Sequence, residues 1–460
     1  MQTPHFIFSL LIVVVVVIIG FLYIEQPEAP IKNSPTNGQS DSTTNKPINS
    51  FELNKDLDKY DKKQSCKVKI NGDMLDNSPI LTPHNQLEYM QPNSSGEIVV
   101  PHGHWLSFHC ADKFAEPYGG QTLQAQCAGD KNFFINNEKV NFSKINCTTI
   151  SIPTPIRTGL CCSGEGTELI IIGNEIKSNG SCYTIPTMQV CFDKILQIPR
   201  FVKRILTPAS IHRQIKVKRK NFTSDDFFGG IDIDHFYKLS EQIKALRRQI
   251  GENALIYVTE ENRLTRGHLA PKADMTYSGQ QKGTFHHVNV MPQWQSFNAG
   301  NWSHLEDDVR QLAHDSNRSL IYFTGTCGVC RLPDENNIQQ ELYLGDDNNV
   351  IPVPKLFYIV VIDADSRKGI AIVGVNNPYL KIDELKTGGY LIAEDVSDDV
   401  DWIKWDRKNI KKGDRCWNRK NIKKGYCYAV SVPDFVKVVK DLPLVGLETT
   451  GILRLKEQPI

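Results

Sequence analysis

Cysteine is distributed very unevenly along this chain, and this distribution limits the folds open to it more than any other feature. Twelve cysteines occur in 460 residues, and eight of them lie between Cys66 and Cys191. A dense, even-numbered set predicts a small domain stapled by disulfides, which form in an oxidising compartment. We therefore expect four disulfides in this part of the chain, although the spacing alone does not say which cysteines pair.

An uncharged apolar run over residues 6–24 indicates the same compartment. In a helix that rises about 1.5 Å per residue, the run is long enough to cross a hydrocarbon core of roughly 30 Å. It is also longer than the apolar part of a usual signal peptide, and no small-residue cleavage motif follows it closely. We predict an uncleaved signal anchor, a transmembrane helix over residues 5–24, with a long cleaved signal peptide as the alternative.

The chain also carries seven Asn-x-Ser/Thr sequons, the acceptor motif for N-linked glycans. They begin at Asn93, Asn141, Asn146, Asn179, Asn221, Asn301 and Asn317. Together with the cysteines, they predict a glycoprotein of the secretory pathway that is extracellular or anchored to a membrane.

Shifts in composition divide the rest of the chain into three parts. Residues 25–64 are rich in Asn, Ser, Thr, Pro and Lys, which predicts a flexible linker. Residues 65–198 combine the eight cysteines with short apolar stretches and turn residues, which predicts a mostly β domain. Residues 199–455 predict an α+β domain, with strands at 357–363 and 370–375 and a helix at 301–315, where apolar residues recur at helical steps.

The net charge of +1 excludes a polycationic chain, so any affinity for nucleic acid must come from local basic clusters. Lys and Arg gather at 203–220 and again at 404–424, where the sequence RKNIKKG occurs twice, at 407–413 and 419–425. Trp402, Trp405 and Trp417 accompany the second cluster and would either stack on bases or pack into the core. Basic loops are also often only solvated.

The four remaining cysteines form two pairs in the sequence. Cys416 and Cys427 bracket the second RKNIKKG copy and would close it with a disulfide. Cys327 and Cys330 form a Cys-x-x-Cys motif, but no second such motif follows. This argues against a zinc site and favours a local disulfide or free thiols.

The segment from residue 265 to residue 310 carries the side chains that phosphodiester hydrolysis needs. The reaction requires a base that takes a proton from water, and positive charge that stabilises the phosphate. Histidine suits the first task because its unperturbed pKa lies near neutral pH, which makes His268 a candidate base. Asn298 offers an oxygen to a hard cation, and Glu306 and Arg310 stand one helical turn apart on one face.

Each of these residues also has a structural interpretation. A single histidine is more often structural than catalytic, and a Glu–Arg pair is often a solvated helix face. Asn298 would equally suit a turn before a helix. His286, His287 and His304 remain further candidates that spacing alone does not exclude.

The order and spacing of the motifs in this segment resemble one known family. The matching residues are Arg266, Gly267 and His268, then Asn289, Pro292 and Gln293, then Asn298, Trp302, Glu306 and Arg310, followed by a Thr-Gly strand at 322–325. Residues 200–455 thus resemble the DNA/RNA non-specific endonuclease family, whose core is the ββα-metal (His-Me) finger with a central antiparallel sheet. The sequence around His268 is similar to arthropod members described as double-stranded ribonucleases or non-specific nucleases.

The resemblance implies a role for each matched residue. His268 would be the general base, Asn298 the direct ligand of one Mg²⁺ with Mn²⁺ as a substitute, and Glu306 would hold a water of the metal's shell. The other implied roles are contacts to the scissile phosphate by Arg266 and Arg310, an upstream phosphate contact by Arg219, and orientation of the base or substrate by Asn289. The expected reaction is endonucleolytic hydrolysis of DNA or RNA that leaves 5′-phosphates.

One position departs from the family pattern, because Thr265 stands where an Asp usually precedes Arg-Gly-His. A threonine does not supply the same negative charge near His268 and Arg266, a difference that bears on the pKa of His268 and on the rate. The rival functions are a weakly active or inactive nucleic-acid-binding member of the same fold, and an adhesion role for the Cys-rich domain. The expected partners are DNA and RNA without sequence preference and, if residues 6–24 are retained, a membrane. A homodimer is left open.

Overall fold

The computed structural model describes residues 65–178, 180–345, 351–405, 417–443 and 446–455 of the chain. The predicted signal anchor at 5–24 and the predicted linker at 25–64 lie outside these residues. Within the described stretches, no helix is both long enough and apolar enough to cross a membrane.

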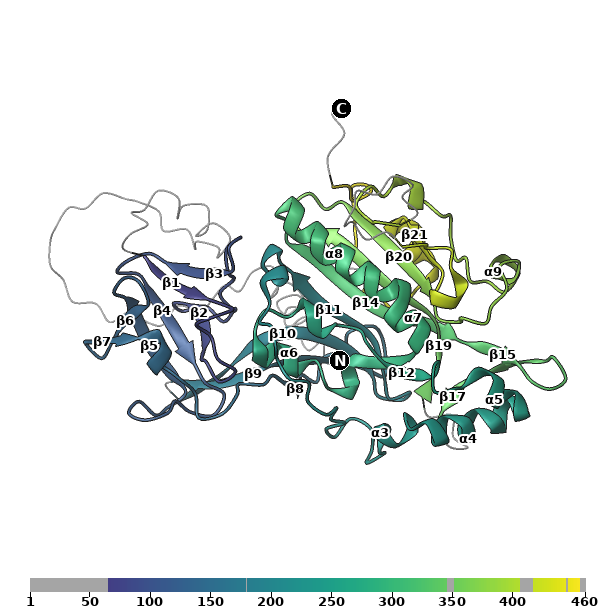
Figure 1. The fold of residues 1–460 in the computed structure, drawn as a ribbon, viewed down its shortest axis with the longest axis horizontal. Coiled ribbons are helices and arrows are strands. Elements are labelled where there is room, and N and C mark those ends of the chain that lie inside the picture. The colour runs from purple at the N-terminus through teal and green to yellow at the C-terminus, as the bar shows by residue number, and fades with distance from the viewer. Residues whose placement is uncertain (1–64, 179, 346–350, 406–416, 444–445, 456–460) are drawn as a thin grey trace, which may run out of the picture. The chain divides into compact units, whose positions relative to one another are not determined.

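Residues 65–150, called the N-terminal module below, form β-structure around an aromatic core. β1 (Cys66–Lys69) pairs with β3 (Glu97–Val100). A five-stranded antiparallel sheet has the order β2-β4-β5-β6-β7, with β2 (Ile80–Pro83), β4 (Trp105–His109), β5 (Thr122–Cys127), β6 (Asn132–Ile135) and β7 (Glu138–Asn141) (Figure 1). Phe108, Phe133 and Phe142 pack edge to face in its core. These residues are mostly β-structure and make up the first part of the stretch 65–198, for which the sequence predicts a mostly β domain.

An eight-stranded antiparallel sheet forms the centre of the remaining chain. Its order is β21-β20-β19-β14-β11-β10-β9-β8. The strands are β8 (Thr154–Arg157), β9 (Thr167–Ser178), β10 (Ser181–Asp193), β11 (Ile198–Leu206), β14 (Leu320–Val329), β19 (Pro354–Asp363), β20 (Gly369–Val375) and β21 (Cys427–Val430). The strands predicted at 357–363 and 370–375 are confirmed as β19 and β20, which pair with each other.

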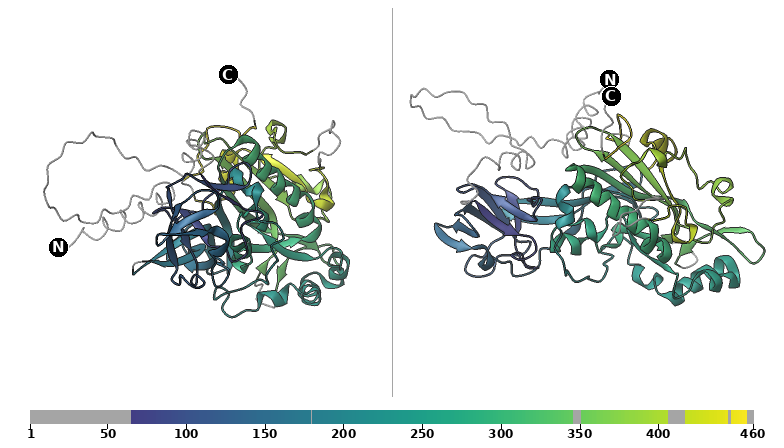
Figure 2. Two further views of the ribbon diagram at one scale, coloured as in Figure 1. Left: turned by 60° about the vertical axis from the view of Figure 1, so that its left-hand side comes forward. Right: turned by 45° about the horizontal axis from the view of Figure 1, so that its top comes forward.

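Both faces of this sheet are covered, which explains why its strands read as continuous apolar runs. On one face, Phe357 and Ile359 share a core with Leu305 of α8 (Ser303–Ser316), the helix predicted at 301–315 (Figures 1 and 2). On the other face, Val360 packs in a core with Phe435 of α10 (Val432–Val438).

Short elements surround the sheet. The helices are α3 (Ile233–Phe236), α4 (Leu239–Ile250), α5 (Ala254–Tyr257), α6 (Ser278–Gly283), α7 (Gln295–Phe297) and α9 (Glu384–Thr387). The strands are β12 (Leu264–His268), β13 (Val290–Trp294), β15 (Arg331–Pro333), β16 (Gln339–Glu341), β17 (Tyr343–Leu344) and β18 (Ile351–Pro352). β12 and β13 form a separate hairpin beside the sheet.

The central sheet extends across the domain boundary that was predicted between residues 198 and 199. β10 pairs with β11 across that point, and β8 and β9 continue the same sheet. The cysteine content of 160–191 suggested membership of the N-terminal domain, whereas strand pairing assigns these residues to the central sheet. Strand pairing in the central sheet therefore continues on both sides of the predicted boundary.

Disulfides in the described residues number three rather than the four expected between Cys66 and Cys191. They join Cys66 to Cys127, Cys110 to Cys147 and Cys162 to Cys191. Cys161 and Cys182 are unpaired and exposed, while Cys327 and Cys330 are free thiols and not a local disulfide. Cys416, and with it the expected bridge to Cys427, lies outside the described residues.

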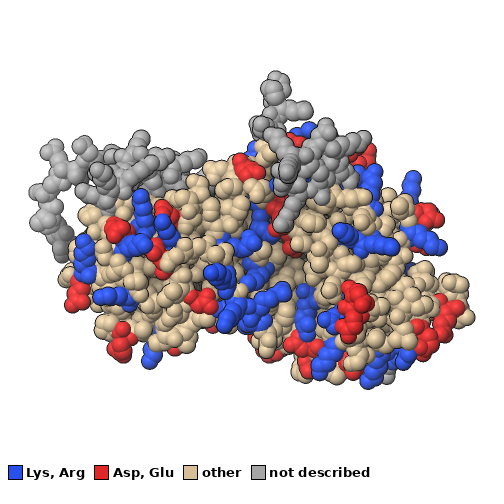
Figure 3. Space-filling model, viewed as in Figure 1, with Lys and Arg blue, Asp and Glu red and all other residues tan. Residues whose placement is uncertain are grey.

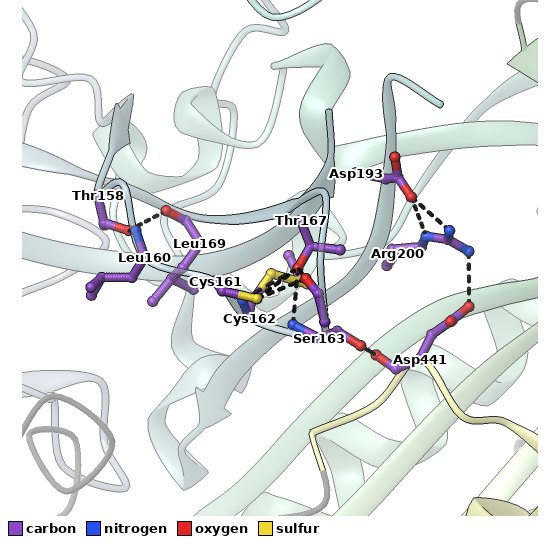
Figure 4. Close-up of a disulfide and its surroundings, with 12 residues drawn as sticks. Thr158, Leu160, Cys161, Cys162, Ser163, Thr167, Leu169, Asp193, Arg200 and Asp441 are labelled. Atoms are coloured by element: carbon purple, nitrogen blue, oxygen red, sulfur yellow. Dashed lines mark hydrogen bonds and ion pairs between the residues drawn. A yellow bond between two sulfur atoms is a disulfide. The ribbon is translucent and has the colours of Figure 1, made fainter. Parts of the chain in front are cut away.

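The disulfide between Cys162 and Cys191 belongs to the central sheet and not to the N-terminal module. It ties the loop before β9 to β10, and a pair of carboxylates lies close by (Figure 4). Arg200 bridges these carboxylates, with Nη2 2.6 Å from Asp193 Oδ2 and Nη1 3.0 Å from Asp441 Oδ2. A covalent link and two ion pairs therefore fix this corner of the sheet.

The sequons differ in accessibility. Asn301 is buried, and its Nδ2 donates to the carbonyl oxygens of Asn418 at 2.8 Å and Gly425 at 2.7 Å. Its amide is therefore not accessible as a glycan acceptor in the folded protein. Asn221 and Asn317 are exposed, and Asn179 lies outside the described residues.

Candidate active site

The candidate site is built on a hairpin followed by a helix. β12 and β13 pair antiparallel, with His268 opposite Val290, and β13 leads through α7 and a kinked turn into α8. Gly267 is required at its position, because a Cβ there would lie 2.6 Å from Cβ of Gln293 on the neighbouring strand. The order strand, strand, helix is the one expected for a ββα unit.

His268 ends β12 and lies in an aromatic setting. Its ring centroid is 5.3 Å from that of Phe222 and 5.2 Å from that of Phe285. Nε2 is buried and has no hydrogen-bond partner among the described residues. Burial and the positive charge of Arg219 lower the pKa of His268 to about 3, so the ring is neutral near pH 7 and able to accept a proton.

Two arginines flank His268. The guanidinium of Arg219 lies 5.5 Å from the centre of the Phe285 ring. Arg266 forms an ion pair with Asp234 of α3 and lies over the Tyr237 ring at 4.5 Å, with 27% of its side chain exposed. Arg266 also lies over the Phe222 ring at 5.4 Å, so two of the three expected phosphate contacts lie against the aromatic rings that enclose His268.

Asn298 reaches the same hairpin from the turn before α8. Its Nδ2 donates a hydrogen bond to Oγ1 of Thr265 at 3.0 Å. Thr265, the residue that departs from the family pattern, lies three positions before His268 on β12. Thr265, which lacks the negative charge of the usual Asp, thus contacts the expected metal ligand Asn298.

Glu306 and Arg310 share one face of α8, as the sequence predicts, but the guanidinium of Arg310 is already bound to carboxylates of the protein. Its Nη1 and Nη2 form ion pairs with Asp274 and Asp307, and only 6% of its side chain is exposed. Arg204 holds the other oxygen of Asp274. Burial raises the pKa of Glu306 to about 8, while the nearby Arg310 acts in the opposite direction. The structure therefore places Arg310 in a buried ion-pair network and not on an open surface.

Asp274 was not identified from the sequence, although it lies only six positions after His268. It is buried and accepts from two guanidinium groups, from Arg204 on β11 and from Arg310 on α8. Asp274 could have been recognised from the Lys-Ala-Asp sequence at 272–274, which places an acidic residue shortly after the Arg-Gly-His motif.

Asn289 acts on the backbone that follows His268. It is fully buried, and its Oδ1 accepts from the N–H of Ala270 at 2.9 Å. Its Nδ2 donates to the carbonyl oxygens of Ala270 and Thr284, both at 3.0 Å. Because every one of these partners is main chain, Asn289 holds the segment after the base and does not face a substrate.

Two of the three other candidate histidines, His286 and His287, have structural partners. His286 contacts Asp225 Oδ2 at 2.8 Å through Nδ1 and the Pro153 carbonyl oxygen at 3.1 Å through Nε2. Nε2 of His287 lies 3.1 Å from Oδ1 of Asp234, the carboxylate that also pairs with Arg266. Both rings are buried, so both are better explained by packing than by catalysis.

A basic surface lies close to the site. Residues 213–220, called the basic strap below, include the exposed Lys216, Lys218 and Arg219. Lys272 joins them, and its pKa is lowered by burial and by the charges of Arg219 and other nearby cations. Figure 3 shows Lys and Arg gathered in the middle of the displayed face.

The tryptophans that accompany the second predicted basic cluster are not exposed for stacking on bases. Residues 406–416 lie outside the described residues. Trp402, Trp405 and Trp417 are buried and belong to the same core as α8. Of the two interpretations left open for these tryptophans, core packing is the one that the structure supports.

Comparisons of the sequence with known proteins point to one family. The family model described as DNA/RNA non-specific endonuclease matches residues 165–422. A salivary endonuclease of Lutzomyia longipalpis is 30% identical over 304 residues, which cover 65% of this chain and 71% of that protein. Salivary protein Tsal2A of Glossina morsitans morsitans is 23% identical over 400 residues, 85% of this chain and 94% of that protein.

Solved structures add a weaker match. One chain of the crystal structure of the EndoG/EndoGI complex aligns at 21% identity with a TM-score of 0.30, covering 45% of this chain and 75% of that chain. The sequence matches carry the assignment: this chain belongs to the DNA/RNA non-specific endonuclease family.

Proposed function

We propose that this protein is a divalent-cation-dependent endonuclease that hydrolyses DNA and RNA without sequence preference, with His268 as general base. The observation that carries the proposal is the neutral, aromatic-enclosed ring of His268, beside Arg219 and at the end of the hairpin that Asn298 contacts. A base poised next to a phosphate-binding cation is what attack of water on a phosphodiester requires.

His268 has one ring nitrogen suited to accept the proton. Nε2 is enclosed, so Nδ1 would take the proton of the attacking water while the water oxygen bonds to phosphorus. The bond from phosphorus to the 3′ oxygen breaks, and this oxygen takes a proton from solvent water, leaving a 5′-phosphate and a 3′-hydroxyl. A phosphate bound at Arg219 would offset the repulsion that lowers the pKa of His268, and so would make the ring a stronger base when substrate is present.

The cation site would use oxygen donors from the start of α8. Asn298 would bind Mg²⁺, or Mn²⁺ in its place, directly, and Glu306 would hold it through water. An amide and a carboxylate oxygen fit this group of hard cations, and Glu306 accepts no hydrogen bond from the described residues. Because burial raises the pKa of Glu306 to about 8, its carboxyl group would release a proton when the cation binds. When bound, the cation supplies positive charge at the phosphate and the leaving oxygen.

Binding without sequence preference would come from the basic strap, because phosphate contacts carry no base information. We also propose that the enzyme acts outside the cell. Its disulfides form in an oxidising compartment, and the relatives it resembles are described as salivary proteins.

The test is digestion of plasmid DNA and of duplex RNA by the wild type, His268→Ala and the control His84→Ala, with Mg²⁺ or with EDTA. We expect the wild type and His84→Ala to cleave only with Mg²⁺, and His268→Ala to be slower by about 10²–10⁴-fold. Cleavage by His268→Ala at the wild-type rate would exclude His268 as the general base. A wild type that binds both nucleic acids but cleaves neither would make the protein an inactive, nucleic-acid-binding member.

A further inference from the structure

Thr265 makes two hydrogen bonds with one hydroxyl group. Oγ1 lies 2.9 Å from the carbonyl oxygen of Gln293, its cross-strand partner on β13. The same Oγ1 lies 3.0 Å from Nδ2 of Asn298. Thr265, the residue that departs from the family pattern, thus links strand β13 of the hairpin to the expected cation ligand Asn298.

The proton count fixes the direction of both bonds. A hydroxyl has one proton to donate, and a main-chain carbonyl is only an acceptor. The Thr265 proton therefore goes to Gln293, and towards Asn298 the hydroxyl is able only to accept. Of the two ends of the Asn298 amide, only the NH₂ end donates, so this end must face Thr265 and Oδ1 must point away from it.

No other hydrogen bond of the Asn298 side chain occurs among the described residues, so Thr265 alone distinguishes the two ends of the amide. Oxygen and nitrogen have nearly the same size, and packing does not separate them. Thr265 itself is held firmly, because it is β-branched and lies in a paired strand. Without its hydroxyl, the amide would be free to turn its NH₂ group towards a cation.

We propose that Thr265 is a positioning residue that turns the Asn298 amide so that Oδ1 faces the cation. The inference rests on the proposed function, since it concerns the cation ligand named there. It also explains the departure from the family pattern. The carboxylate of an Asp at this position would accept from Nδ2 in the same way, so the requirement is for an acceptor and not for a negative charge.

The test measures cation binding directly, with Mn²⁺ as the probe. Free Mn²⁺ is followed by electron paramagnetic resonance in titrations of the wild type, Thr265→Val, Thr265→Ser and Thr265→Asp. Valine keeps the shape but removes the acceptor, so we expect about 10-fold weaker Mn²⁺ binding or more. Serine and aspartate keep an acceptor, and we expect both to bind Mn²⁺ within about 3-fold of the wild type or more tightly. The Mg²⁺ concentration for half-maximal cleavage should follow the same order.

Two results would overturn the inference: Mn²⁺ binding by Thr265→Val as tight as that of the wild type, or binding by Thr265→Ser as weak as that of Thr265→Val. Thermal unfolding checks that each variant is folded. If Thr265→Val does not fold, the comparison of Thr265→Ala with Thr265→Ser asks the same question. Failure of the proposed function looks different, because the wild type itself would then bind no Mn²⁺ or His268→Ala would still cleave.

Discussion

The neighbours of His268 keep its imidazole uncharged. Burial of the ring among Phe222 and Phe285 and the guanidinium of Arg219 both disfavour a protonated ring, which is why the pKa of His268 falls to about 3. The folded state therefore binds this proton less readily than the unfolded chain, in which the pKa is about 6.5. The contribution of His268 to the free energy of unfolding is complete above the unfolded pKa and is lost as the pH falls from there towards about 3.

We predict that the His268 ring of the folded protein does not titrate between about pH 8 and about pH 5. Nuclear magnetic resonance of the ring Cε1–H group measures the titration. The His268 signal is assigned as the one that is missing from the spectrum of His268→Ala. Arg219→Gln removes the repelling charge, so the pKa of His268 should move up towards its ordinary value. A wild-type midpoint near the unperturbed value of about 6.5 would show that the ring is not enclosed as described.

The carboxylate of Asp274 should contribute strongly to the free energy of unfolding, although the side chain is short. It is buried between Arg204 and Arg310, so its removal leaves two buried guanidinium groups without their shared partner. We predict that Asp274→Asn lowers the free energy of unfolding by about 3–5 kcal/mol, measured by urea denaturation. The control is Asp307→Asn, which removes the other, half-exposed partner of Arg310 and should cost about 1 kcal/mol or less. Equal losses in the two variants would contradict the network.

Among the elements, those that depend on local pattern could be predicted from the sequence. The helical steps of apolar residues identified α8, and unbroken apolar runs identified β19 and β20. Arg310 was correctly placed on α8 beside Glu306, but its partner Asp274 is 36 residues away, and no periodicity links the two. The direction of the Thr265 hydrogen bonds likewise depends on strand pairing, which a substitution at one position does not reveal.

The basic strap is held in place from two sides. Asn71 of the N-terminal module donates to the Arg213 carbonyl oxygen at 3.0 Å and accepts from the N–H of Ile215 at 2.9 Å. Val217 is buried, and Lys272 donates to its carbonyl oxygen at 2.8 Å. The neighbouring lysines project from a fixed backbone, which suits them to phosphate contacts along a nucleic acid.

We predict that Lys216→Gln with Lys218→Gln weakens binding of duplex DNA and lowers its dependence on salt. Each lost phosphate contact reduces the slope of log K against log salt by about 0.9, so the double variant should lose about 1–2 units. Fluorescence anisotropy at several salt concentrations, in EDTA to prevent cleavage, measures the slope. Lys139→Gln with Lys144→Gln, two exposed lysines of the N-terminal module, is the matched control. An unchanged slope in the strap variant would remove the strap from the binding surface.

Over the whole described molecule, the N-terminal module and the central sheet share contacts. Asp76 of the module accepts from Lys282 Nζ at 2.6 Å and from Ser278 Oγ at 2.7 Å, both on α6. The core of the module also includes Ile176 and Ile185 of the central sheet. A boundary drawn from composition fails here for a physical reason, because the cysteine-rich segment and the sheet bury apolar side chains against each other.

Tyr277 is the side chain that tests this coupling most directly. It is buried in the core of the N-terminal module, stacks on Tyr89 at 5.5 Å and donates to the Met90 carbonyl oxygen, although its backbone leads into α6. We predict that Tyr277→Ala lowers the free energy of unfolding by about 3–5 kcal/mol. Calorimetry should show a single transition that moves to lower temperature as a whole.

The matched control is Tyr183→Ala, which removes an exposed tyrosine from β10 and should leave the transition nearly unchanged. Two transitions, of which Tyr277→Ala shifts only one, would mean that the module and the sheet unfold independently. A single shifted transition would mean that the disulfide-rich module supports the part of the chain that carries His268. Loss of a disulfide in the module should then reduce cleavage even though none of its cysteines lies at the site.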